Sequence, residues 1–346
     1  MVITGKQSDY VMNLTRRALD PENIVSGRCF LCGGPPTKGK GEHVFPRWLQ
    51  NRFDLWDQKL TLLNGTRIPY RDIRVPACED CNSRVLGKTE TYVSKLQGSA
   101  VSDWSHEHSF EVGRWLSKIL IGILIKEASL LHDRRNPELG MIFPPEGVDE
   151  LVLMHLLVQS WRKIVRFRSL HADHPFTLYI YQIEKDDDFS DFNLSTNLFG
   201  KSLCIRFGEL GFAFVADGGL QHEMAELGPY ALGFKKLHPV QFDELAARVH
   251  YQSALRDATH LYVHFESLES FDFSQIEVTP YTRNKLEDGS DRFFREWSLS
   301  ELGLVLKKYQ VHGWNYLIDD TGEATYTFLV GENGTKQDFP AGSFSK

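Results

Sequence analysis

The sequence has no uninterrupted run of about 18 uncharged apolar residues, which is the length that a helix needs to cross a bilayer. Its most hydrophobic stretch, residues 116–131, is interrupted by Lys118, Lys126 and Glu127. The N-terminal residues also lack the apolar core and the small-residue cleavage site of a secretory signal. We therefore expect a cytoplasmic protein that does not contact membranes.

Other common signals are missing as well. The chain has no repeat with a period of about 20–50 residues and no low-complexity segment. Residues 100–346 contain no glycine-rich phosphate loop, no nucleophile elbow and no second group of metal ligands. The length of 346 residues, of which 42% are apolar and 25% charged, instead predicts a globular protein of about two domains.

The charge is uneven along the chain. The formal net charge of −7 argues against a protein whose whole surface binds phosphate groups. Residues 1–100, however, hold 15 Lys and Arg against 10 Asp and Glu, whereas the remaining residues hold 24 against 36. The basic part of the chain is therefore N-terminal.

Only five cysteines are present, and four of them form two pairs with the same spacing: Cys29 with Cys32, and Cys78 with Cys81. Two such turns that converge give the closed tetrahedral site that zinc prefers. Because all four positions are occupied by sulfur, this zinc is expected to be structural. Reduced pairs or disulfides are the alternative, and a cytoplasmic chain disfavours disulfides. Cys204 stands alone in an apparent strand and is expected to be a buried thiol.

The hydrophobic patterns predict an α+β fold with a lead-in at residues 1–27, a zinc module at residues 28–98 and a larger domain at residues 99–346. In the lead-in and the module we expect helices over residues 10–19, 47–55 and 82–96, and a hairpin of residues 59–63 and 66–75 around Asn64-Gly65. In the larger domain we expect helices over residues 110–131, 148–171 and 240–258, and strands over residues 176–183, 203–216 and 261–265. The acidic run 184–188 is interpreted as a solvated loop, and the tail from residue 331 as frayed.

Between the two cysteine pairs lies Glu42-His43-Val44-Phe45-Pro46, and Asn82 directly follows the last cysteine. This order of knuckle, Glu-His, hairpin, knuckle and Asn at a helix start resembles the HNH (His-Me finger, ββα-metal) endonucleases. It is most similar to the type that carries a four-cysteine zinc, as in phage endonuclease VII. The resemblance covers about residues 28–96 and implies a ββα-metal, treble-clef-like module.

The resemblance implies that His43 is the general base, and that Glu42 and Asn82 hold one divalent cation, either Mg²⁺ or Mn²⁺. The expected reaction is the hydrolysis of phosphodiester bonds in nucleic acid, with DNA as the expected substrate. Elementary chemistry agrees, because a histidine titrates close to neutral pH and oxygen ligands suit a hard cation. Arg47, one turn beyond His43, is the residue that we expect to contact the scissile phosphate.

Two positions depart from the family pattern. The middle Asn that orients the loop of the base is absent, and Asn64 and Asp72 are imperfect substitutes for it. The last position is Asn82 in place of the commoner His, which favours Mg²⁺ or Mn²⁺ over Ni²⁺ or Zn²⁺. Glu90 lies eight residues beyond Asn82, about 12 Å along a helix, and is interpreted as a surface residue or as one behind the metal ligands. Nothing in the module has the pattern of a base-reading helix or of an exposed aromatic stacking surface, so we expect little sequence preference.

The alternative is a non-catalytic zinc-binding adaptor for nucleic acid or protein, in which Glu42-His43 is a surface pair. Under either hypothesis, residues 99–346 are expected to recognise a partner, a regulatory ligand or a second copy of the chain. A nuclease with one site per chain that cuts both strands of a duplex suggests a homodimer. The layout is similar to that of restriction and phage-defence nucleases.

Overall fold

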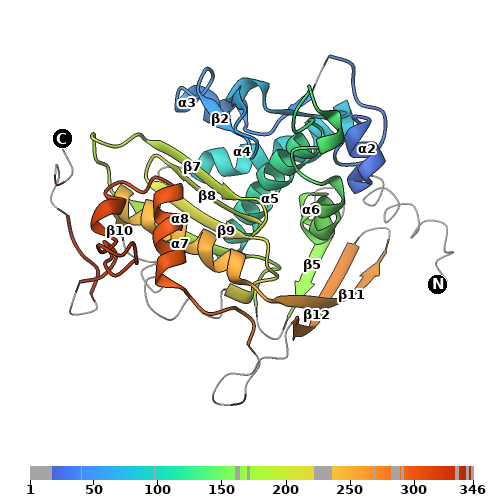
Figure 1. Ribbon diagram of the computed structural model, residues 1–346. Helices are drawn as coiled ribbons and strands as arrows, with labels where there is room; N and C mark the ends of the chain where they lie inside the picture. The colour runs from blue at the N-terminus through green and yellow to red at the C-terminus, as the bar shows by residue number, and fades with distance from the viewer. Residues whose placement is uncertain are drawn as a thin grey trace. The chain divides into compact units, whose positions relative to one another are not determined.

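The computed structural model describes residues 18–39, 41–96, 99–159, 164–169, 172–221, 236–267, 270–281, 289, 292–331, 335–339 and 343. The fold is mixed α+β (Figure 1). The chain divides into two compact units. Unit 1 comprises residues 1–96, 107–167 and 264–273, and unit 2 comprises residues 97–106, 168–263 and 274–346. Residues 107–167, which follow the sequence-based boundary at 98, thus group with the zinc module.

No helix in the described part of the chain combines the length and the apolar character that crossing a membrane requires. The expected helix over residues 10–19 lies almost wholly outside the described residues.

Unit 1 is built from short strands and one long helix. Its elements are α2 (Pro21–Val25), β1 (Gly41–His43), α3 (Arg47–Arg52), β2 (Lys59–Thr61), β3 (Arg67–Pro69), β4 (Arg74–Pro76), a π-helix (Cys81–Leu86), α4 (Gly87–Leu96), α5 (His106–Ala128) and α6 (Val152–Val158). The helices expected at residues 47–55, 82–96 and 110–131 are confirmed as α3, the π-helix with α4, and α5. Helix α5 forms the centre of the unit, since Trp115, Ile119 and Leu120 are fully buried.

The expected hairpin is only partly correct. Strands β2 and β3 pair around Asn64-Gly65, where Gly65 has a positive φ of 79°. The second strand then ends at Pro69 instead of continuing to residue 75, because a 3₁₀ turn buries Tyr70 against the Phe45 ring. Strand β4 follows this turn and pairs with β1, not with β2.

The helix expected over residues 148–171 is wrong. Helix α6 ends at Val158, and Ile164–Arg168 forms strand β5. In β5 the half-buried Val165 and Phe167 alternate with exposed Arg166 and Arg168, which is the period of a strand and not of a helix. Arg166 pairs with Asp272 at 3.3 Å, whereas Arg162 and Lys163 lie outside the described residues.

Unit 2 contains a five-stranded sheet in the order β10-β6-β9-β8-β7. Its strands are β6 (Thr177–Ile183), β7 (Phe192–Asn197), β8 (Ser202–Phe207), β9 (Leu210–Val215) and β10 (Lys236–Leu237). The single strand expected over residues 203–216 is therefore a hairpin, which turns at Gly208 with a φ of 56°. Helix α7 (Pro239–Leu255) packs Phe242, Leu245 and Val249 against this sheet. Cys204 is a buried thiol in β8, as expected.

The remaining elements include one further helix and one further sheet. Helix α8 (Leu299–Lys308) packs Leu302 and Leu306 against α7. Strands β11 (Ala258–Glu266) and β12 (Ser270–Pro280) join β5 in a three-stranded sheet with the order β11-β12-β5.

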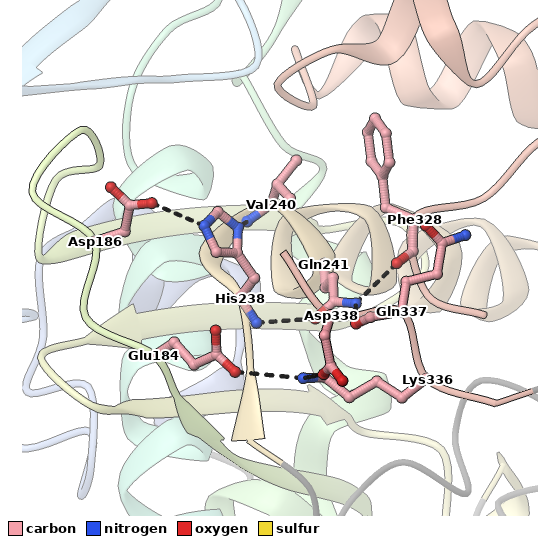
Figure 2. Close-up of polar contacts among 9 residues, drawn as sticks. All are labelled: Glu184, Asp186, His238, Val240, Gln241, Phe328, Lys336, Gln337 and Asp338. Carbon is pink, nitrogen blue, oxygen red and sulfur yellow. Dashed lines mark hydrogen bonds and ion pairs between the residues drawn. The ribbon is translucent and has the colours of Figure 1, made fainter. Parts of the chain in front are cut away.

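The acidic run 184–188 is less solvated than expected. Asp186 accepts a hydrogen bond of 2.9 Å from His238 Nε2 at the start of α7, and Glu184 pairs with Lys336 at 3.3 Å (Figure 2). Gln241 donates hydrogen bonds of 2.8 Å to the carbonyls of Phe328 and Gln337. The described residues 335–339 are therefore anchored to α7 rather than frayed.

Glu127 on α5 predicts a pH-dependent stability. This buried carboxylate accepts a hydrogen bond of 3.2 Å from the Leu63 amide, and burial raises the pKa of Glu127 to about 7. Between about pH 5 and 7 the folded state binds a proton that the unfolded state has lost, so the free energy of unfolding falls as the pH rises. Glu127→Gln should remove the contribution of Glu127 to this fall and make the variant up to about 3 kcal/mol more stable at pH 8.

Urea unfolding at pH 5 and at pH 8 measures this difference. Glu138→Gln, at an exposed position, is the matched control and should keep the wild-type pH dependence. An unchanged pH dependence in Glu127→Gln would contradict the role of Glu127.

Candidate metal centre and histidine site

The four paired cysteines come together in unit 1. Their sulfur atoms all lie within 4.8 Å of one another, and the Sγ atoms of Cys32 and Cys78 are 3.8 Å apart. A tetrahedron of sulfur atoms about 2.3 Å from a central zinc has edges of about 3.8 Å. The cluster therefore fits a zinc ion.

Each cysteine pair is shaped by its own backbone. In the first knuckle, the Cys29 amide donates to Gly34 O at 2.9 Å, and Gly33 adopts a positive φ of 67° that favours glycine. In the second knuckle, the Asn82 amide donates to Cys78 O at 3.0 Å as the π-helix begins. The Phe30 amide donates to Pro76 O at 2.9 Å and so connects the first knuckle to strand β4.

Helix α6 also supports the first knuckle. His155 Nε2 donates to Phe30 O at 2.7 Å, and Gln159 Nε2 donates to Leu31 O at 2.6 Å. Burial lowers the pKa of His155 to about 4, so its ring is neutral. No sequence pattern indicates this contact, because His155 and Phe30 are 125 residues apart in the chain.

His43 lies at the end of β1, opposite Arg74 on β4, and is largely buried. Its Nδ1 atom is 3.4 Å from the side-chain nitrogen Nε2 of Gln50. Its Nε2 atom accepts a hydrogen bond of 3.5 Å from Nε of Arg47. Burial, together with the positive charges of Arg74 and Arg47, lowers the pKa of His43 to about 4. The imidazole is therefore neutral at pH 7, which is the form that accepts a proton.

Glu42 faces a different set of partners from His43, as expected for neighbouring residues of a strand. Its carboxylate lies 2.6 Å from Nζ of Lys118 on α5, and the Glu90 carboxylate lies 2.8 Å from the same atom. Burial raises the pKa of Glu42, while Lys118 opposes this effect. Glu90 thus lies beside Glu42, which agrees with the expectation of a residue behind Glu42 and not with that of a surface residue.

Asn82 is half-buried and lies in the first turn of the π-helix. Within the described ranges, the four cysteines are the one group of three or more His, Cys, Asp and Glu side chains close enough to share an ion. A divalent cation on Glu42 and Asn82 therefore stays a prediction. Carboxylate and amide oxygens remain the donor types that Mg²⁺ and Mn²⁺ prefer.

Three side chains that the sequence analysis did not assign to the site also lie near His43: Trp56, Gln50 and Arg74. The Trp56 ring is 6.3 Å from the His43 ring, and Trp56 is 37% exposed, although the sequence pattern gave no exposed aromatic at this site. Gln50 is buried and also donates to Phe45 O at 2.7 Å. Arg74 faces His43 through the β1–β4 register, which the sequence could have shown only if the pairing of β4 had been known.

Other basic residues of the module are engaged or exposed elsewhere. Arg84 pairs with Asp80 at 3.0 Å, and Arg71 pairs with Asp57. Arg47 and Arg74 are therefore the arginines of the module whose charge acts on His43.

Zinc removal should unfold the loop-rich part of unit 1, because metal binding supplies folding free energy to a segment with short strands. Cys78→Ser should abolish stoichiometric zinc and lower the melting temperature of this unit. Metal content measured by atomic emission, together with near-ultraviolet circular dichroism with and without a chelator, checks both effects. Cys204→Ala is the matched control and should retain one zinc per chain; full zinc in Cys78→Ser would refute the site.

Comparison with protein-family models, with curated proteins and with solved structures finds no match to this chain.

Proposed function

We propose that the protein is a metal-dependent HNH-type endonuclease that hydrolyses phosphodiester bonds in nucleic acid, with DNA as its substrate. The observation that carries the proposal is the neutral His43 ring next to Arg47 and Arg74, on a scaffold that a four-cysteine cluster can hold together. A neutral imidazole beside two cations suits the attack of water on a phosphodiester.

In this mechanism His43 takes a proton from the water that attacks the phosphorus atom. Arg47 and Arg74 bind the non-bridging phosphate oxygens and hold the phosphodiester in line with that water. Glu42 and Asn82 would hold a divalent cation, Mg²⁺ or Mn²⁺, which supplies positive charge to the phosphoryl and leaving oxygens. The zinc takes no part in the reaction, because its four positions are filled by cysteine.

One observation favours the second candidate, a non-catalytic zinc-binding adaptor. The Glu42 carboxylate already has a cation partner in Lys118, so its burial does not by itself require a metal. The two functions differ in what His43 does. An adaptor needs no base, whereas a nuclease loses its reaction without one.

Unit 2 is proposed to recognise a partner, a regulatory ligand or a second copy of the chain. Most of unit 2 comes from the part of the chain beyond residue 100, where Asp and Glu outnumber Lys and Arg. This acidic excess disfavours a broad phosphate-binding face on unit 2. A role in restriction or phage defence and a homodimer that cuts both strands would suit this layout.

His43→Ala tests the proposed function. With Mg²⁺ or Mn²⁺, the wild-type protein should nick and linearise plasmid DNA, and His43→Ala should be slower by about 10²–10⁴-fold, because a general base contributes that much. His132→Ala, in the same unit, is the matched control and should cut at the wild-type rate. All three proteins must contain zinc; cutting by His43→Ala at the wild-type rate would exclude His43 as the base.

Arg47→Ala tests the phosphate contact. Loss of one cation from the phosphate-binding surface should weaken DNA binding and reduce the slope of log K against log salt by about 1. Arg67→Ala, an exposed arginine on β3, is the matched control and should leave both quantities unchanged. Fluorescence anisotropy over a salt series measures the slope, and equal slopes for Arg47→Ala and wild type would place Arg47 away from the phosphate.

A further inference from the structure

A buried lysine approaches the strand end that carries His43. Lys118 lies in the middle of α5 and is only 2% exposed. Its ammonium nitrogen lies 2.6 Å from His43 O, 3.1 Å from Val44 O, 2.6 Å from the Glu42 carboxylate and 2.8 Å from the Glu90 carboxylate. The pattern of hydrophobic residues marks Lys118 only as an interruption of an apolar helix.

The two carboxylates explain how the charge is tolerated, since a buried ammonium group needs paired counter-charges. They do not explain why the same atom also contacts two consecutive main-chain carbonyls. An ammonium group has three protons and can be shared among such acceptors. The contacts to His43 O and Val44 O fix the backbone at the point where β1 ends and the base is attached.

A second contact one helical turn further along α5 supports this arrangement. At Gly122, an added Cβ would lie 2.8 Å from Cγ2 of Val44, which is too close for any side chain. Lys118 and Gly122 are four residues apart and so lie on one face of the helix. This face of α5 therefore contacts residues 43–44 in two ways: the Lys118 ammonium group bonds their carbonyls, and Gly122 packs closely against the Val44 side chain.

We propose that Lys118 is a positioning residue for the nuclease site: from outside the zinc module it holds the main chain of His43 and Val44 and the carboxylate of Glu42. The inference rests on the proposed function for its effect on catalysis. It makes α5 a necessary part of the site, so that residues 28–96 alone are incomplete. Lys118 itself does not touch the substrate.

The experiment uses the full chain with Lys118→Met, Lys118→Arg and the matched control Lys126→Met, which removes another lysine of α5. Lys118→Met should lower kcat for plasmid nicking by about 10²-fold, because a small displacement of a catalytic group costs about that much, and should leave KM for DNA unchanged. Lys118→Arg keeps the charge and should recover part of kcat. Lys126→Met should behave as wild type.

Amide hydrogen exchange gives a readout that does not depend on activity. In Lys118→Met, the peptide that contains residues 41–46 should exchange faster, while the peptides around the cysteine pairs keep their protection and the protein keeps its zinc. If every protein is inert but this peptide exchanges faster, the positioning role stands and the nuclease assignment fails. If the wild type cuts and a zinc-loaded Lys118→Met has normal kcat and normal exchange, the positioning role is overturned.

Removal of one partner from a buried ion pair can unfold a protein. If Lys118→Met loses zinc or structure, the double variant Lys118→Met/Glu90→Gln is measured in its place. It also neutralises Glu90, which is one of the two carboxylates that lose their counter-charge. The same criteria apply to it: lower kcat with faster exchange at residues 41–46 supports the role of Lys118, and wild-type values for both overturn it.

Discussion

The whole N-terminal part of the molecule depends on the convergence of four thiols. Strands β1, β2, β3 and β4 are three residues long each, and strands of that length cannot build a core of their own. The Cys29 pair and the Cys78 pair are separated by the entire Glu-His segment and the hairpin, so a metal ion bound by both pairs closes this loop at its base. The backbone bond from Phe30 to Pro76 then aligns the first knuckle with β4.

Electrostatics divides the site into two faces of one short strand. His43 lies near arginines, and its pKa is low both because it is buried and because those charges oppose protonation. Glu42, one residue earlier, points to the opposite side, where it shares the Lys118 ammonium group with Glu90. The strand therefore presents a neutral imidazole to one side and a buried ion cluster to the other.

Helix α5 explains why the compact unit is larger than the motif. Its apolar residues fill the centre of unit 1. Lys118 and Gly122 contact the main chain and the side chain of residues 43–44, and Glu127 contacts the Leu63 amide near the hairpin turn. Helix α6 adds His155 and Gln159 against the first knuckle. The motif at residues 28–96 is too short to form a large core of its own. Helices α5 and α6, which follow it in the chain, supply the apolar residues that it packs against.

The sequence by itself determined the cysteine cluster, the long buried helix and the mixed α+β class. These features depend on short spacings, namely two residues between paired thiols and the 3.6-residue period of a helix, and short spacings are visible in a linear pattern. Only the tertiary structure decided that β4 pairs with β1, that residues 164–168 form a strand, and that Lys118 and Glu90 belong beside Glu42. The Lys118–His43 contact joins residues 75 positions apart. No local propensity encodes such a contact, because it exists only once the apolar face of α5 has packed against the zinc module.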